Sequence, residues 1–233
     1  MRAIYKRELL SHFTSLLAYV FSAMFMLLAG ILFYINNIYF GMVSVKNFFS
    51  LLTNWSIFTL PILTMRIMAG DRRLNTDRLL MTAPVSVRDI VLGKFLAVFT
   101  IVFGALALIF IYTAVLSFFG AINWAETISC FVGFMLMCGF VLALGTFMSA
   151  LTDSQIVSLS STYAVLIVMV FLDNIAAAAP SGAAKLLMWI SPLRRFLDFA
   201  MGILNPAAIV YYISLTVLLL FLAVNAAERR RFV

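Results

Sequence analysis

The residues that could carry out catalysis are few and lie far apart in the sequence. His12 is the single histidine and sits in a basic N-terminal stretch, so it cannot form a Ser/His pair within an apolar run. Cys130 and Cys138 lie eight residues apart in one such run, more than two helical turns, which is too far for a disulfide and favours buried apolar roles. Gly93-Lys94 lacks the upstream glycine of a phosphate-binding P-loop. We therefore expect no catalytic residue, no metal site and no cofactor site on this chain.

Hydroxyl and amide side chains inside two apolar runs form a second group of candidates. They are Asn54, Ser56, Ser158, Ser161 and Thr162. Such groups can line a polar cavity, or they can bond to a neighbouring turn or helix, which is the commoner role. The middle of every apolar run lacks the carboxylate that is typical of proton- or sodium-coupled carriers, so the sequence argues against that class of transporter.

The composition requires that these residues be carried by membrane helices. The chain is 65% hydrophobic and only 11% charged, with a mean hydropathy of +1.12. Soluble domains carry about a quarter charged residues, so this chain lacks the polar groups to cover a globule in water. The net charge of +7 comes from basic residues at the ends of apolar runs, where they meet anionic lipid. We expect membrane lipid, and no nucleic acid, as a partner.

The predicted fold is an all-α integral membrane protein with a single transmembrane domain, residues 1–233. Six helices of about 20 residues each are expected to cross the bilayer. Their predicted ranges are about 15–35, 47–69, 95–119, 127–150, 155–172 and 206–227. Pro61 predicts a kink in the second span, because proline cannot donate a backbone hydrogen bond and crowds the preceding turn.

Two further helices are predicted to lie along the membrane surfaces. Residues 1–14 place apolar side chains at helical spacing beside basic ones, which is typical of an interfacial helix. The excursion 173–205 contains an amphipathic pattern with Pro192 at its first position. Its apolar stripe consists of Leu193, Phe196, Leu197, Ala200, Met201 and Leu204. Arg194 and Asp198 lie off that stripe, four residues apart, and are placed to pair.

The distribution of lysine and arginine predicts the orientation of the chain. With the N-terminus inside, twelve of the 16 basic residues fall on the cytoplasmic side. The other four are Lys46, Lys185, Arg194 and Arg195. This positive-inside bias places both termini in the cytoplasm, which requires an even number of crossings.

Residues 70–94 form the only substantial polar segment between two predicted spans. The segment offers a helix cap, two apolar anchors, a helix-ending proline and a charged lead into the third span. These features are carried by Thr76, Leu79, Leu80, Pro84, Arg88 and Asp89. From the residues alone, a docking surface for another protein and a solvated loop that only fixes topology are equally good interpretations.

Four places in the sequence carry a resemblance to a known family. They are Tyr5–Leu9 with Leu17–Val20, the stretch Asn75–Ser86 with Ile90–Lys94, the pair Ser191-Pro192, and the basic C-terminal end. The stretch from Asn75 is similar to the family's "GTLELLLTSPVS…IVLGK" sequence, with Asn75 in place of glycine and Arg78 in place of glutamate. In these places the chain resembles the permease subunits of ABC-2 type exporters, most closely the gliding-motility-type branch.

The resemblance implies a division of labour between several chains. Two permease chains, identical or homologous, would pair in a bacterial cell membrane, and two separate ABC ATPase subunits would bind ATP and Mg beneath them. Segment 70–94 would be the coupling helix that docks on the ATPase. The alternative is a non-transporting membrane platform that uses the same kind of ATPase to act on a protein partner. A channel or secondary carrier is a third hypothesis.

Overall fold

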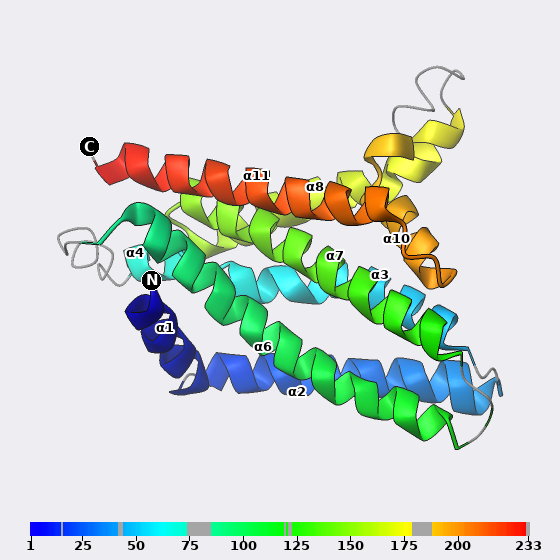
Figure 1. The fold of residues 1–233 in the computed structure, drawn as a ribbon. Coiled ribbons are helices and arrows are strands. Elements are labelled where there is room, and N and C mark those ends of the chain that lie inside the picture. Colours follow the sequence, from blue (N-terminus) through cyan, green and yellow to red (C-terminus); the bar gives the residue numbers. More distant parts are fainter. Residues whose placement is uncertain are drawn as a thin grey trace.

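The computed structural model describes residues 1–14, 16–41, 44–73, 85–118, 120, 123–178 and 188–231. Every regular element in these ranges is helical (Figure 1). In chain order the helices are α1 (Arg2–Thr14), α2 (Leu16–Phe33) with its π-helical extension η1 (Tyr34–Tyr39), α3 (Val45–Thr64), α4 (Ala69–Arg73), α6 (Val87–Leu116), α7 (Trp124–Leu151), α8 (Gln155–Ala178), α10 (Pro192–Ala200) and α11 (Pro206–Arg231). The predicted all-α class is confirmed.

Six helical stretches in the described residues are long and apolar enough to cross a membrane. They are Ala18–Tyr39, Val45–Arg72, Val87–Leu116, Trp124–Leu151, Gln155–Leu172 and Pro206–Arg229. In Figure 1 these helices run side by side, with α1, α4 and both chain termini at one end and α10 at the other. We call these the basal end and the distal end. The six-span membrane architecture agrees with the sequence prediction.

Helix α7 is the centre of the bundle. In its most apolar stretch 72% of the residues are buried, against 28% for the first span and 17% for α8. It contacts α3, α6, α8, α10 and α11. Two glycines permit this close packing: a Cβ at Gly145 would lie 2.0 Å from the Thr64 hydroxyl on α3, and one at Gly133 would lie 2.5 Å from the Phe199 side chain on α10. Helix α7 therefore links elements at both ends of the molecule.

The break in the second span falls after Pro61 rather than before it. Helix α3 ends at Thr64, a turn occupies Met65–Met68, and α4 resumes the helix at Ala69. The third span also differs from the prediction, because α6 begins at Val87 instead of near residue 95. Ser86 caps it by accepting a hydrogen bond from the Asp89 amide at 3.2 Å. The last residues of the predicted polar segment thus belong to a helix.

Helix α10 begins where the sequence predicts it, and Phe196 and Ala200 of the predicted apolar stripe are buried. Ser191 caps it, and it ends at Ala200, before a turn in which Gly202 has a φ of +79°. Of the predicted stripe, Leu197 and Met201 are exposed, and Leu204 lies beyond the helix. Phe199, which the prediction left out, is fully buried because it fills the space beside Gly133. Asp198 accepts a hydrogen bond from the Asn205 amide at 2.9 Å, in place of the predicted pair with Arg194.

Candidate coupling site

Lys94 joins three helices at the basal end. Its side chain is only 4% exposed although it carries a charge. The ammonium nitrogen lies 3.1 Å from Glu8 Oε1 on α1 and 2.5 Å from Asp71 Oδ2 on α4. A buried charge is tolerated only when it is paired, and here two carboxylates from two other helices supply the pairing. One lysine therefore ties both α1 and α4 to α6.

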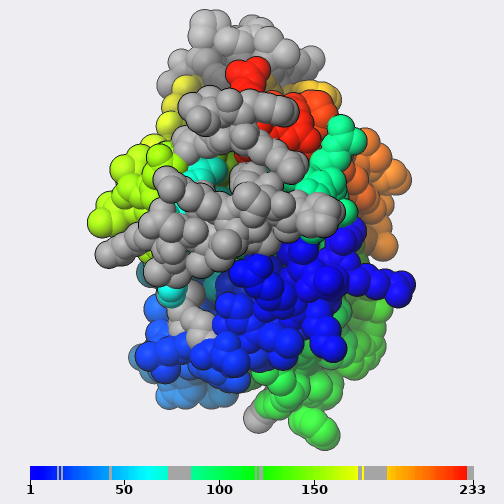
Figure 2. All heavy atoms as spheres, turned by 90° about the vertical axis from the view of Figure 1, so that its left-hand side faces the viewer, coloured from blue at the N-terminus to red at the C-terminus, as the bar shows by residue number. Residues whose placement is uncertain are grey.

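The apolar contact between α1 and α6 lies on the face of α6 that carries Lys94. Ile4 is buried against Ile90. A Cβ at Gly93 would approach the Ile4 side chain to 3.0 Å, so this glycine lets the two helices come close. About two turns further along α6, the hydroxyls of Tyr5 and Thr100 lie 3.0 Å apart. Figure 2 shows α1 lying across the basal end beside the start of α6.

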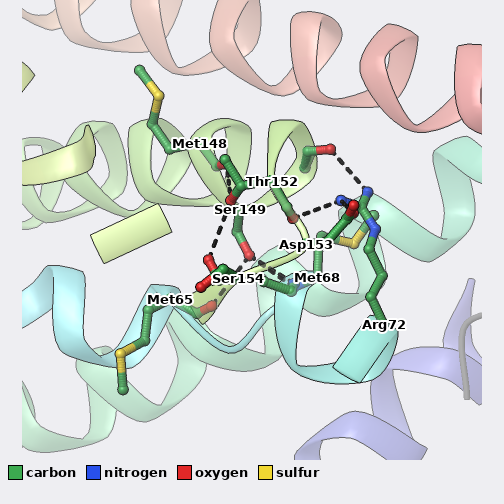
Figure 3. Close-up of polar contacts among 10 residues, drawn as sticks. Met65, Met68, Arg72, Met148, Ser149, Thr152, Asp153 and Ser154 are labelled. Carbon is green, nitrogen blue, oxygen red and sulfur yellow. Dashed lines mark hydrogen bonds and ion pairs between the residues drawn. The ribbon is translucent and has the colours of Figure 1, made fainter. Parts of the chain in front are cut away.

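Ser149, near the end of α7, is hydrogen-bonded to the turn between α3 and α4 (Figure 3). The buried Ser149 hydroxyl accepts hydrogen bonds from the backbone amides of Met68 and Ala69, both at 3.0 Å, and donates to the Met65 carbonyl at 3.4 Å. An interruption within a helix leaves such backbone amides without an intrahelical hydrogen-bond partner. Burying an amide without a partner costs free energy. One side chain on α7 thus stabilises the break.

Arg72 makes a second link to the same region. Its guanidinium donates to the Ala150 carbonyl at 2.8 Å and to the Thr152 carbonyl at 2.7 Å, and it pairs with Asp153 at 3.2 Å (Figure 3). The first two contacts satisfy carbonyls at the C-terminus of α7, where a cation is favoured by the helix dipole. Arg72 therefore ties α4 to the connection between α7 and α8.

Comparison with known proteins places this architecture in a family. Residues 44–226 match the family described as ABC-2 family transporter protein. The chain belongs to that family. No curated protein gives a significant match. Membership makes the chain a membrane-spanning permease, the transport subunit of an ABC system rather than its catalytic subunit, and implies an ABC ATPase as its partner. The matched range contains Asp71, Lys94 and Ser149, and α1 precedes it.

The predicted coupling residues of the permease fall into two groups. Thr76, Leu79, Leu80 and Pro84 lie outside the described residues, so their role stays a prediction. The other two are in the first turn of α6, where they diverge. Asp89 lies 3.6 Å from the N-terminal amine, next to α1. Arg88 is exposed and faces α11, where it lines a hollow with Leu92 and Val224. Their contact with an ATPase stays a prediction.

The predicted cavity residues do not gather at one site. Asn54 lines a small cavity of about 160 Å³ between α3 and α10, together with Ser50 and Thr53. Ser56 and Thr162 are buried and donate to backbone carbonyls four residues earlier in their own helices. Ser161 donates in the same helix to the Ser158 carbonyl at 3.0 Å. These bonds fit the commoner role of hydroxyls inside membrane helices.

Ser158 differs from the other hydroxyls of this set. It is fully buried in α8, and its own hydroxyl has no hydrogen-bond partner within the described residues. A buried hydroxyl without a partner costs free energy, so this position is a weak point in the packing of α8. The hydroxyls of Ser56, Ser161 and Thr162 are therefore already hydrogen-bonded within their own helices, whereas the hydroxyl of Ser158 is not.

His12 belongs to the surroundings of the Lys94 cluster. Burial holds the pKa of its imidazole below the ordinary value of 6.5. Glu8 and Asp71 act to raise that pKa, while Lys94 and Arg66 act to lower it. The neutral imidazole is therefore favoured in the folded chain. His12 thus lies within electrostatic reach of the basal ion pairs, a position that its place in the sequence did not predict.

The residues that organise the basal end were not predicted from the sequence. Glu8, Asp71, Lys94 and Ser149 were not among the predicted site residues. One signal was available: Glu8 and Asp71 are acidic residues in stretches that are otherwise basic, and such residues often pair with a cation. The sequence gives no indication of the role of Ser149, because that role depends on the turn between α3 and α4, and Met68 of that turn lies 81 residues away in the sequence.

Proposed function

We propose that this permease is driven by a separate ATPase through segment 70–94. The observation that carries the proposal is the anchoring of the described flanks of that segment. On one side, Asp71 and Arg72 tie α4 to Lys94 and to the end of α7. On the other, Ile90 and Lys94 tie the start of α6 to α1. A force that an ATPase applies to residues 74–84 would thus be transmitted through these contacts to α1, α6 and α7.

The basal end is proposed to face the cytoplasm of a bacterial cell. The positive-inside distribution of lysine and arginine supports this orientation. It places α1, α4 and both termini on the side where an ATPase has access to ATP and Mg. Assignment to the gliding-motility-type branch rests on the sequence resemblance of residues 75–94.

The permease is further proposed to act as a pair of chains, identical or homologous. The first span and α8 are the least buried of the six spans. Their exposed side chains include large apolar residues such as Leu27, Ile31, Ile156 and Val168. ATP binding to the ATPase pair would bring the two segments 70–94 together and switch the pair between inward- and outward-facing states.

The docking role is tested with Leu79→Asp combined with Leu80→Asp. Two new charges should remove the apolar anchors and abolish co-purification of the ATPase subunit, while the amount of permease in the membrane stays unchanged. Ser11→Asp combined with Thr14→Asp is the matched control, because it adds the same charges to exposed polar positions of α1. Undiminished docking of the Leu79/Leu80 variant would remove the coupling role from this segment.

A second measurement separates export from work on a partner protein. The complex is reconstituted in vesicles, and ATP-dependent movement of solute is compared with stimulation of ATP turnover by candidate protein partners. Solute movement is expected if the chain forms a translocation path. ATP turnover that responds only to a protein partner, with no solute movement, would favour the platform alternative.

A further inference from the structure

The surface between α6 and α11 carries a long apolar groove. It consists of two adjoining hollows, of about 270 Å³ near the basal end and about 180 Å³ further along, which share Val217 as a wall. Each is larger than the roughly 150 Å³ apolar cavity that suffices to bind benzene. Thr216 is the single hydroxyl among the described lining residues, and it already donates to the Tyr212 carbonyl at 2.8 Å. The groove therefore suits a hydrocarbon.

The length of the groove matches one leaflet of a bilayer. Its lining on α6 runs from Arg88 to Phe99, and its lining on the antiparallel α11 runs from Val224 to Ile213. Eleven residues at 1.5 Å per residue give about 16 Å on each wall. Half of a hydrocarbon core of roughly 30 Å is about 15 Å. A single acyl chain would fill the groove from the membrane surface to the midplane.

A cation stands at the membrane-surface end of the groove. Arg88 is exposed and, within the part of the chain that the structure describes, forms no ion pair or hydrogen bond. Its neighbour Asp89 is engaged by the N-terminal amine on the α1 side. Arg88 also lies in the first turn of α6, where the helix dipole favours an anion. On α11, Glu228 and Arg229 follow Val224 by about one turn and offset each other.

We propose that this groove is a binding site for an anionic phospholipid of the leaflet at the basal end. One acyl chain lies along α6 and α11, and the phosphate group pairs with Arg88. A protein segment is less well matched, because it would not use a single cation at one end of an apolar groove. The proposal depends on the membrane setting of the permease and not on its coupling role.

The test is lipid competition followed by native mass spectrometry. The purified permease is equilibrated with equal amounts of phosphatidylglycerol and phosphatidylcholine of identical acyl chains, and the bound ratio is measured. Wild-type protein should prefer phosphatidylglycerol, and Arg88→Gln should reduce that preference about fivefold, the effect of one interfacial basic residue. Arg194→Gln, which removes an exposed arginine at the distal end, should leave the ratio unchanged.

A groove-filling variant tests the acyl-chain site. Val217→Trp places a large side chain where the two hollows meet and should lower the number of bound lipids by one for both lipid types. An unchanged ratio in Arg88→Gln, or an unchanged lipid count in Val217→Trp, would overturn the proposal. Formation of a disulfide between two Val217→Cys chains would also overturn it, because a second permease would then occupy the groove.

Discussion

Replacement of Lys94 by methionine is the sharpest test of how the basal end is held together. Methionine keeps most of the volume but removes the charge that neutralises Glu8 and Asp71. Removing one partner of a buried ion pair costs about 3–5 kcal/mol, because the remaining charge is left without compensation. The two carboxylates are 13% and 24% exposed, so water relieves part of that cost and we expect the lower value, about 3 kcal/mol.

The cost should appear as local opening of α1 rather than as loss of the bundle. Helix α1 has one buried residue, Ile4, and its other polar contacts with α6 are the Tyr5–Thr100 hydroxyl pair and the ion pair between the N-terminal amine and Asp89. A loss of about 3 kcal/mol in the docking of α1 corresponds to roughly a hundredfold faster amide hydrogen exchange in this helix. Exchange in α7, which is buried in the centre, should change little. The measurement is hydrogen exchange by mass spectrometry on the purified permease.

A compensated variant separates charge from packing. Lys94→Met combined with Glu8→Gln and Asp71→Asn leaves three neutral side chains of similar volume, and neutral replacement of a whole buried ion-pair group is often close to neutral in stability. Exchange in α1 should therefore return toward the wild-type rate. If Lys94→Met leaves α1 exchange unchanged, or if the triple variant is as open as the single one, the ion-pair explanation is wrong.

Two further predictions concern the same end of the molecule. Because the pKa of His12 is lowered in the folded chain, docking of α1 should be strongest above the ordinary pKa of 6.5 and weaken as the pH falls below it, and His12→Asn should flatten this dependence in α1 hydrogen exchange. A pH dependence that persists in His12→Asn would contradict this. Ser149→Ala should lower the free energy of unfolding by about 2 kcal/mol, because the buried amides of Met68 and Ala69 lose their acceptor. Thermal unfolding in detergent measures the loss, and Ser154→Ala, at an exposed position, is the control.

The membrane architecture could be predicted because it depends on composition and segment length. Helices that cross a bilayer must hydrogen-bond their own backbone groups and present apolar side chains to lipid. Each span is therefore visible in the sequence as a continuous run of apolar residues. The number and order of the six spans agree with those runs. The start of α6 was placed too late, because Arg88, Asp89 and Lys94 interrupt the apolar run although they lie within the helix.

Contacts between the spans could not be predicted in this way, because they depend on residues that are distant in the sequence. Helical spacing did not identify Phe199 as a buried residue of α10, because the space that it fills exists only beside Gly133 of α7. In the same way, Lys94 looks like one more basic residue that fixes topology. Its role becomes visible only when Glu8 and Asp71, which are distant in the sequence, are brought to it by the fold.

The contacts of α7 explain how a movement at the basal end could reach the distal end. Ser149 and Gly133 lie 16 residues apart on this one continuous helix, a distance of about 24 Å. Near one end of that interval α7 holds the turn before α4, and at the other it seats Phe199 of α10. Under the proposed coupling role, a displacement of α4 must either break the two hydrogen bonds to Ser149 or carry α7 with it. Since breaking them leaves two buried amides unpaired, joint motion of α4 and α7 costs less.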